Sequence, residues 1–381
     1  MIRVLNVTKS TGGIARYNYR LSQRIDRQQF DWHVLCLSEN NQAYASELEA
    51  LGHTAFLMDM DRYNINVFSD IGLLRKLTRL IQEGDYDIVV GHGSKAGFLV
   101  RMAGRLAKTH SVYGLHSMSF VPRIHGNKAH LYRLFEHVAS ALTDGHIVVL
   151  SQSIRAKLLE LGLTNEDNIT TIYTGIDLEQ FKPNIQRDAA CRALGLDPSR
   201  PVCGWAARFV PQKAPLAFLD IMENVVARVP NVQIFMAGDG ELKPETMQRA
   251  EQMNLAKNII FPPWQNDINR MLSAFDVYIL NSRWEGLPQS LLEAMAMECA
   301  CVTSNVDGNA EVIEHGISGF IHDPDATEAM AADIVRLLED SNLRRTVGQA
   351  ARQRVKSHFS VQKWVDEWQD LLTQLAEKRP V

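Results

Sequence analysis

NSRWEGLPQSLLEAMAMECACVTSN, residues 281 to 305, places Glu285 on a loop and Glu293 inside an apolar helical pattern, and a strand-like run follows. Pro288 stands where proline favours the first turn of a helix. A buried carboxylate is costly unless another group pairs with it or hydrogen-bonds to it. Glu293 therefore predicts a partner for its charge, and we expect that partner to be a ligand.

The same alternation of strand and helix extends along the whole chain. Strand-like runs in the first half are IRVLNVT, WHVLCLS, TAFLMDM, DIVVGHG, SVYGLH, HIVVLS and ITTIYTG. The pattern restarts after FKPNIQRDAACRALGLDPSRPV, which is typical of a linker with one short helix, and gives VCGWAAR, VQIFMAGDG, NIIFPPW, VYILNS, CACVTSN and GFIHD. Alternating strands and helices predict parallel sheets, so we expect two α/β domains joined near residue 183.

Length and composition agree with two soluble domains. A chain of 381 residues exceeds what one hydrophobic core usually serves, and 46% hydrophobic with 22% charged residues is ordinary for globular proteins. The five cysteines are scattered without Cys-x-x-Cys spacing, which argues against disulfides and structural zinc. The N-terminus has no signal-peptide pattern and no run is long enough to span a membrane, so we expect a cytoplasmic protein.

Charge is distributed unevenly along the sequence. Residues 1 to 144 hold 17 Lys and Arg against 13 Asp and Glu, although the whole chain has a net charge of -4. From Ile88 to Phe135 there is no acidic residue, whereas seven Lys or Arg and five His occur. In SKAGFLVRMAGRLAK these cations alternate with apolar residues at helical spacing. An anionic membrane surface is one partner that such a stretch predicts, and a core-facing helix with a basic back is the alternative.

Candidate site residues in the first half follow the predicted strands, because doubly wound sheets bind ligands beyond the carboxyl ends of their strands. Gly12 and Gly13 come after the first strand and before a helix, where backbone N–H groups can approach an anion. His92 and His116 each follow a later strand. The dinucleotide-binding pattern G-x-G-x-x-G is absent from this position.

In the second half, Arg208 and Lys213 share the loop after the first predicted strand. Two cations at the mouth of a sheet suit a diphosphate, since Arg can bind two oxygens and Lys acts as a mobile point charge. Gly238 and Gly240 follow the second strand and permit close approach of the backbone to a planar ring.

The opening stretch adds the remaining candidates. Gly286 marks a turn, and the N–H groups at a helix start near Leu287 and Pro288 would face phosphate. Glu285 is placed to accept hydrogen bonds from sugar hydroxyls, and Glu293 from the two hydroxyls of a ribose, because a carboxylate accepts both protons of a diol.

In this order and spacing the motifs resemble those of the retaining glycosyltransferases of family 4, which have the GT-B fold. Glu285 and Glu293, with seven residues between them, resemble the Glu-x(7)-Glu motif of that family. Similarity extends over nearly the whole chain through TGGIARY, GHGSKAG, the GLH ending at His116, NITTIYTGIDLEQF, ARFVPQK, AGDGEL and GNAEVIEHGISGFI. This chain has Ala207, Ala214 and Asn309 where the family commonly has glycine.

The resemblance implies two Rossmann-like, doubly wound domains facing a central cleft. Residues 1–182 would bind the acceptor, residues 183–356 would bind the nucleotide sugar, and a helix in 357–381 would pack back on the first domain. Gly12, Gly13, Gly238, Gly240, Gly286, Leu287, Pro288 and Glu293 would be binding residues. No metal and no cofactor apart from the nucleotide sugar are implied.

The implied activity is transfer of a hexose or N-acetylhexosamine from a nucleotide diphosphate sugar, with UDP as the favoured carrier and with retention of configuration. Arg208 and Lys213 would stabilise the leaving diphosphate, Glu285 would orient the donor sugar, and His116 would lie near that sugar. The acceptor would be a saccharide or lipid-linked saccharide in bacterial cell-surface polysaccharide or lipopolysaccharide synthesis. Such an enzyme would be cytoplasmic or peripheral on the inner face of the cell membrane, with no nucleic acid as partner.

Two other functions remain open from the sequence. A GT-B sugar-nucleotide epimerase or a phosphorylase would need further acid and base residues or a cofactor lysine, for which we find no signal. A non-catalytic protein that binds sugar nucleotides is disfavoured by the presence of both acids and both cations.

Overall fold

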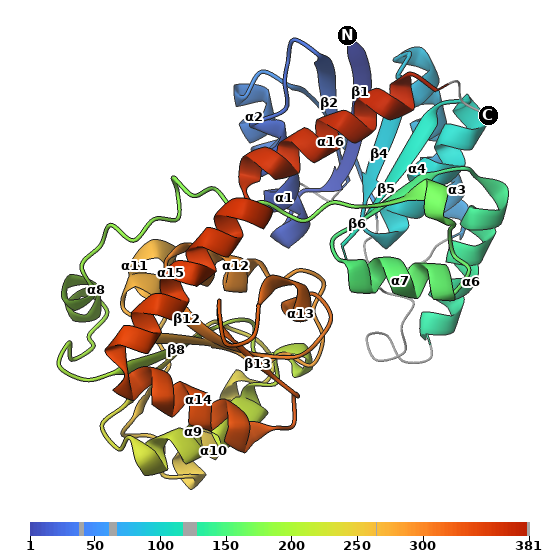
Figure 1. Cartoon of the computed structure of the whole chain (residues 1–381). Helices are drawn as coiled ribbons and strands as arrows, with labels where there is room; N and C mark the ends of the chain where they lie inside the picture. Colours follow the sequence, from blue (N-terminus) through green and yellow to red (C-terminus); the bar gives the residue numbers. More distant parts are fainter. Residues whose placement is uncertain (38–41, 61–66, 117–127, 264, 379–381) are drawn as a thin grey trace. The chain divides into compact units, whose positions relative to one another are not determined.

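The computed structural model describes residues 1–37, 42–60, 67–116, 128–263 and 265–378 (Figure 1). Contacts divide the chain into two compact units, one of Met1–Tyr173 with Trp364–Val381 and one of Thr174–Lys363. These boundaries fall at residues 173 and 363, whereas the sequence analysis placed them at 182 and 356.

The first unit is built on a seven-stranded parallel sheet. Its strands are β1 (Ile2–Lys9), β2 (Phe30–Leu37), β3 (Thr54–Met58), β4 (Ile88–His92), β5 (His110–Leu115), β6 (His146–Val149) and β7 (Ile169–Thr171). They lie in the order β3-β2-β1-β4-β5-β6-β7. Each of the seven predicted strand runs of the first half is confirmed.

Helices connect these strands and cover the sheet (Figure 1). They are α1 (Gly12–Ser22), α2 (Gln42–Ala50), α3 (Val67–Glu83), α4 (Ser94–Ala107), α6 (Lys128–Leu142), α7 (Gln152–Glu160) and the short η1 (Glu166–Asn168), together with most of α16 (Val361–Ala376). A parallel sheet that is covered on both faces needs apolar side chains on both, which explains near-continuous runs such as Ile88–Val90. Those three residues have no exposed surface.

The second unit contains a six-stranded parallel sheet. Its strands are β8 (Val202–Ala206), β9 (Gln233–Ala237), β10 (Ile259–Ile260), β11 (Val277–Leu280), β12 (Ala300–Ser304) and β13 (Phe320–His322), in the order β10-β9-β8-β11-β12-β13. Its helices are α8 (Arg187–Ala193), η2 (Pro211–Lys213), α9 (Pro215–Arg228), α10 (Lys243–Gln252), α11 (Ile268–Ser273), α12 (Gln289–Ala296), α13 (Asn309–Val312), α14 (Thr327–Glu339) and α15 (Ser341–His358). The second predicted series of strands is also confirmed, as is the short helix, α8, before it.

Both sheets reverse their strand order at one position. In the first unit β1 lies between β2 and β4, and in the second β8 lies between β9 and β11. Loops that leave the carboxyl ends of two such neighbours run in opposite directions and leave a crevice between them, which is where doubly wound sheets bind ligands. The two Rossmann-like sheets that were predicted are therefore present, each with a reversal of strand order of this kind.

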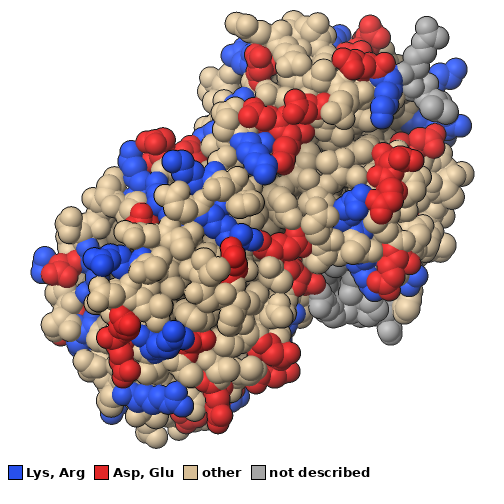
Figure 2. All heavy atoms as spheres, viewed as in Figure 1, with Lys and Arg blue, Asp and Glu red and all other residues tan. Residues whose placement is uncertain are grey.

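Charged side chains are mixed on the face of the molecule that Figure 2 shows, with Lys and Arg lying close to Asp and Glu. Exposed ion pairs such as Arg249 with Asp220 belong to this pattern. Pairs of this kind contribute about 0–1 kcal/mol each. Although Lys and Arg are unevenly distributed along the sequence, this face thus has no large patch of one charge sign.

The C-terminal helix α16 joins the first unit through a buried tyrosine. The Tyr17 hydroxyl on α1 accepts a hydrogen bond from the indole N–H of Trp364 at 3.0 Å and another from that of Trp368 at 2.7 Å. All three side chains are buried, and the rings of Tyr17 and Trp364 meet edge to face at 4.7 Å. Burial also raises the pKa of Tyr17, so its hydroxyl stays neutral. One oxygen atom therefore satisfies two indole donors that have no access to water.

Replacing this oxygen should weaken the attachment of α16. Tyr17→Phe leaves two buried indole N–H groups without their acceptor, and each buried unsatisfied donor costs about 1–3 kcal/mol. We expect the free energy of unfolding, measured by urea denaturation, to fall by about 2 kcal/mol or more. Tyr19→Phe, a half-buried position on the same helix, is the matched control and should change stability little. Equal stability of the two variants would contradict this account of the contact.

Candidate functional site

Three loops meet at the crevice of the second unit. The turn after β9 packs against the loop after β8, where Phe209 N–H donates to the Asp239 carbonyl at 2.9 Å and Leu242 N–H donates to the Phe209 carbonyl at 2.9 Å. Gly238 has φ +142°, and a Cβ there would overlap the carbonyl oxygen of Ala207. Gly240 has φ +149°, and a Cβ there would lie 2.5 Å from the carbonyl oxygen of Phe209. Both predicted glycines are thus needed for the two loops to approach each other.

The loop after β8 ends in a left-handed residue. Ala214, one of the three positions where family 4 commonly has glycine, has φ +46° and ψ 53°. A side chain in this region of φ and ψ costs roughly 1 kcal/mol, which glycine avoids. Asn281, after β11, donates to the Ala214 carbonyl at 2.9 Å and accepts from Trp205 Nε1 at 3.1 Å. These buried bonds hold the strained turn in place.

An acid and a cation from two of these loops form an ion pair. The Lys213 ammonium donates to Oε1 of Glu285, and their side chains are 14% and 7% exposed. The Glu285 N–H in turn donates to the Asp307 carboxylate at 3.1 Å. A carboxylate and an ammonium this deeply buried each compensate the desolvation of the other. The structure therefore brings together two of the predicted site residues, which are 72 positions apart.

Glu293 is less buried than we expected. It projects from α12 between buried neighbours, but its own side chain is half-buried. The sequence analysis treated this carboxylate as buried, whereas α12 turns Glu293, like Gln289 and Ser290, towards the edge of the core. Glu293 and Glu285 both raise the pKa of Tyr278, although burial of that phenol is the main cause. Both acids therefore lie within electrostatic reach of one buried hydroxyl.

The start of α12 also differs from the prediction. The helix begins at Gln289 with Pro288 immediately before it, and not at Leu287. Leu287 is buried, and a Cβ on Gly308 would overlap the carbonyl oxygen of Gly286. The turn that carries Gly286 is thus held against the loop after β12.

Arg208 lies on the same loop as Lys213 but is exposed. The structure places its backbone beside the Gly238 turn without burying its guanidinium. Asn309, another position where glycine is common, begins α13 and donates from its side chain to the Ser304 carbonyl at 3.0 Å. A glycine could not make that bond.

In the first unit the ends of β4 and β5 bring the two predicted histidines together. His92 Nδ1 and His116 Nε2 are 3.0 Å apart. The Tyr17 ring meets His116 edge to face at 4.7 Å, and its centroid lies 5.6 Å from that of His92. Gly114 on β5 makes room for this pair, since a Cβ there would lie 2.5 Å from His92 Nδ1.

Burial keeps both imidazoles neutral. Burial, with a smaller contribution from Lys9, lowers the pKa of His116 to about 4. Burial and then His116 lower the pKa of His92 well below its ordinary value. Within the described residues, His92 Nε2 has no hydrogen-bond partner. At neutral pH the pair can share one N–H between them but carries no charge.

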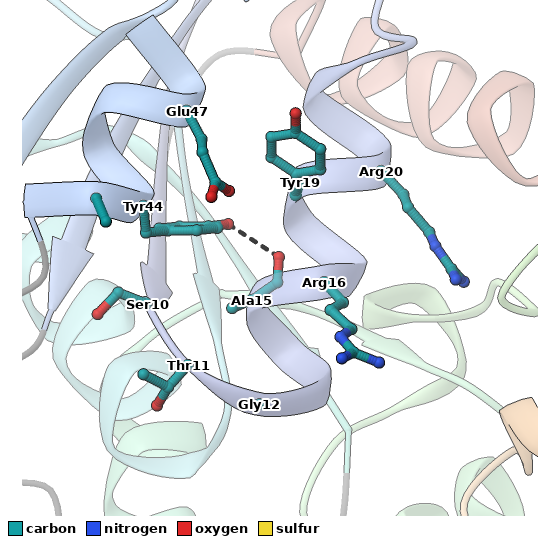
Figure 3. Close-up of a pocket in the computed structure, with 10 residues that line it drawn as sticks. Ser10, Thr11, Gly12, Ala15, Arg16, Tyr19, Arg20, Tyr44 and Glu47 are labelled. Atoms are coloured by element: carbon teal, nitrogen blue, oxygen red, sulfur yellow. Dashed lines mark hydrogen bonds between the residues drawn. The ribbon is translucent and has the colours of Figure 1, made fainter. Parts of the chain in front are cut away.

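A pocket of about 330 Å³ opens beside α1 (Figure 3). The loop after β1, α1 and α2 form its wall, and its lining residues are Ser10, Thr11, Gly12, Ala15, Arg16, Tyr19, Arg20, Ala43, Tyr44 and Glu47. Figure 3 shows the Glu47 carboxylate above the Tyr44 ring, whereas Arg16 and Arg20 extend from α1 away from Glu47. The Tyr44 hydroxyl donates to the Ala15 carbonyl at 2.9 Å, which fixes the ring.

Of the two predicted N-terminal glycines, Gly12 lines this pocket and begins α1 with φ +78°. Gly13 follows it in the helix, and a Cβ at either position would meet nothing within 4 Å. The space in front of both backbones is therefore open.

The sequence analysis did not identify several residues that line or support these sites, among them Tyr44, Glu47, Tyr278 and Asp307. Tyr44 and Glu47 come from a helix whose contact with α1 has no signal in the sequence. Tyr278 reads as an ordinary strand residue, and its hydroxyl donates to the Ala206 carbonyl at 3.4 Å. Asp307 follows a predicted strand, so the rule that selected His92 and His116 could have found it.

The residues that the structure describes contain no group of three or more His, Cys, Asp or Glu placed to hold a metal ion.

Family comparison supports the sequence-based resemblance in both halves. A family model described as Glycosyltransferase Family 4 matches residues 11–180. A second model, described as Glycosyl transferases group 1, matches residues 186–354. Each unit is therefore matched over most of its length.

Among individual proteins, an Escherichia coli UDP-Gal:alpha-D-GlcNAc-diphosphoundecaprenol alpha-1,3-galactosyltransferase is 29% identical over 94% of this chain and 93% of its own. The Staphylococcus aureus capsular polysaccharide biosynthesis glycosyltransferase CapM is 27% identical over 81% of this chain and 82% of its own. Among solved structures, Anabaena Alr3699/HepE in complex with UDP has a TM-score of 0.83 at 20% identity, covering 98% of this chain and 100% of its own. A Rickettsia africae glycosyltransferase has a TM-score of 0.85 at 18% identity over 99% of both chains. The predicted GT-B fold is confirmed.

The lowered pKa of His116 should make stability depend on pH. Because His116 has a pKa of about 4 in the folded chain and an ordinary value of 6.5 when unfolded, the unfolded state binds more protons between these values. The free energy of unfolding should therefore fall as the pH drops from about 6.5 to about 4, by up to about 3 kcal/mol from this residue.

Urea denaturation at a series of pH values measures this dependence. His116→Gln should remove part of the slope, and His358→Gln, at an exposed position in the second unit, is the control that should keep it. A variant slope equal to that of the unmodified chain would show that His116 is protonated as readily in the folded state as in the unfolded one.

Proposed function

This chain belongs to glycosyltransferase family 4, and from that membership we propose that it transfers a hexose or N-acetylhexosamine from a UDP-sugar to a saccharide acceptor, with retention of configuration and without a metal. The observation that carries the proposal is the ion pair of Lys213 and Glu285, whose lysine lies on the loop that packs against the Gly238 turn. Names of the relatives support UDP as the carrier and a bacterial cell-surface polysaccharide as the product.

In this proposal the second unit binds the donor. The turn that carries Gly238 and Gly240 accepts the base, and Glu293 accepts hydrogen bonds from the ribose hydroxyls. Arg208, which is exposed and can reorient, joins Lys213 and the N-terminus of α12 around the diphosphate. Gly286, Leu287 and Pro288 form the turn that presents this helix end to the phosphates.

The Lys213–Glu285 pair exchanges partners when the donor binds. Without a donor, each charge compensates the burial of the other. A diphosphate offers Lys213 a partner of higher charge, and a sugar hydroxyl can then donate to Glu285. As the bond between the anomeric carbon and the phosphate oxygen breaks, negative charge grows on the diphosphate next to Lys213. Stabilising this charge lowers the barrier.

We further propose that the acceptor hydroxyl attacks the anomeric carbon from the side of the departing diphosphate, which takes up its proton. Glu285 orients the donor sugar, and His116, being neutral, offers hydrogen bonds to that sugar without adding charge. No step in this scheme needs a protein-bound covalent intermediate.

The acceptor belongs to the first unit in this proposal. The pocket beside α1 combines an aromatic ring face, a carboxylate and the hydroxyls of Ser10 and Thr11, which are groups that suit a saccharide. Arg16 and the open Gly12 and Gly13 backbone suit an anionic group attached to it. A saccharide linked to a diphosphate lipid has both parts. We therefore propose that the protein works in the cytoplasm, next to the inner face of the membrane.

The donor site can be tested with UDP and a UDP-sugar separately. Lys213→Met removes the charge that meets the diphosphate, so UDP affinity measured by calorimetry should fall by about tenfold or more. Glu285→Gln removes a carboxylate that competes for Lys213, so UDP should bind at least as tightly as before. Transfer, measured as kcat/KM, should nevertheless fall by about 100-fold because the donor sugar loses its acceptor of hydrogen bonds.

Lys257→Met is the matched control for charge, since Lys257 is exposed in the same unit. It should leave both UDP binding and transfer unchanged. Undiminished UDP affinity in Lys213→Met would contradict the proposed donor site.

Substitutions in the acceptor pocket should change KM for the acceptor and leave KM for the donor unchanged. Glu47→Gln and Arg16→Gln should each raise KM for the acceptor by about fivefold to tenfold while KM for the donor stays constant, since Gln can still hydrogen-bond and only the charge-assisted part of the bond, about 1 kcal/mol, is lost. Glu49→Gln, an exposed acid on the same helix as Glu47 that does not line the pocket, serves as the control. If Glu47→Gln changed only donor KM, the pocket would not be the acceptor site.

A further inference from the structure

Helix α6 exposes an apolar face. Leu131, Leu134, Val138 and Leu142 are 46%, 57%, 37% and 54% exposed. Their spacing of three, four and four residues places them on one side of the helix. We call these four side chains the α6 stripe. They are four of the ten large hydrophobic side chains that are exposed within the described residues, so the exposure is concentrated on one element.

The opposite side of α6 is fixed in the core. Ala129, Glu136 and Ala139 are buried there, and Glu136 pairs with the buried Arg101 of α4. The Tyr113 ring lies 4.7 Å from the guanidinium of Arg101 and adds to this contact. Breaking a buried ion pair leaves a charge without compensation, so the helix cannot rotate to bury its stripe. The exposure of the α6 stripe is therefore a property of the folded unit.

Basic side chains flank the stripe. Arg133, His130 and His137 lie on or next to the exposed side of α6, and the only acidic residue of the helix is the buried Glu136. At the end of α4, Arg105 and Lys108 are exposed around Leu106.

The end of α4 adjoins the end of α6. Arg105, Lys108 and Thr143–Gly145 line one small pocket, so these two cations lie near Leu142. Asp144, which is exposed, is the one acid among these lining residues. An apolar strip with an arginine along its side and two further cations at its end matches the boundary between lipid headgroups and acyl chains.

We propose that the α6 stripe docks the first unit onto an anionic lipid bilayer, with the leucines entering the headgroup–acyl boundary and the flanking cations contacting lipid phosphates. An apolar patch of this kind on a soluble unit marks an interaction surface, and the surrounding positive charge selects an anionic bilayer as the partner. Within the described residues no helix is long and apolar enough to cross a membrane, so the contact is peripheral. This docking proposal depends on the proposed function in one respect, which is that a lipid-linked acceptor would lie at the same membrane surface.

Vesicle flotation with the full chain tests the surface directly. The unmodified protein should float with vesicles of phosphatidylcholine mixed with phosphatidylglycerol, and binding should weaken with pure phosphatidylcholine or at high salt. Leu131→Gln combined with Leu134→Gln should reduce the partition coefficient by about tenfold or more, since apolar burial and charge act together. Arg133→Gln should reduce it less and should remove part of the salt dependence.

The matched control is Met247→Gln combined with Ile317→Gln, which removes two exposed apolar side chains from the second unit. This variant should float like the unmodified protein. Thermal unfolding should show the same midpoint for both double variants, because the substituted side chains are exposed. Equal flotation of the two double variants would overturn the proposal.

Two other outcomes would also overturn it. If the unmodified protein ignores anionic vesicles but sediments as a dimer that the α6 substitutions dissociate, the stripe is an interface between copies of this chain. If it binds neither vesicles nor a second copy, the stripe has no such role. Transfer to a water-soluble saccharide acceptor is measured in parallel. It should be unchanged in the α6 variant, and its absence in the unmodified protein would count against the proposed function and not against the docking surface.

Discussion

The parallel pairing of β8 with β9 on one side and β11 on the other is the constraint on which the candidate site depends. Because all three strands run in the same direction, their carboxyl ends meet at one edge, and the loops that follow them must share that edge. This is why the turn at Gly238, the loop ending in Lys213 and the turn carrying Glu285 come into contact although they are far apart in sequence. The pairing of β1, β4 and β5 does the same for His92 and His116 in the first unit.

The carboxyl-end edges of the two sheets differ in the charge of the side chains that they bring together. In the second unit the edge carries opposite charges that compensate each other, so Lys213 and Glu285 can both be buried. In the first unit burial removes charge from His116 and His92 and leaves a neutral, hydrogen-bonding surface. One edge therefore carries a compensated pair of charges, and the other a pair of neutral imidazoles.

Much of this could be predicted from the sequence, because strand and helix periodicity and the residues after strands are local signals. All thirteen predicted strands are present, and Lys213 and Glu285 meet. The prediction failed where packing between elements decides the result. Glu293 is half-buried because of the rotation of α12, and the pocket beside α1 depends on Tyr44 and Glu47 from a separate helix. Ala214 is a further example. Its left-handed backbone is held by a hydrogen bond from Asn281, which is distant in sequence, so no local pattern predicts this contact.

The two tryptophans of α16 that donate to Tyr17 follow the entire second unit in the chain. During synthesis the ribosome must therefore release all of the second unit before the first can acquire its last helix. Until α16 has been synthesised, Tyr17 and the neighbouring apolar surface of α1 lack the packing that α16 provides, although all seven strands of the sheet have been made. Domains generally fold as units in order of synthesis. In this chain the first unit stays incomplete until the second unit has been synthesised. We expect aggregation and chaperone binding to be most pronounced during this interval.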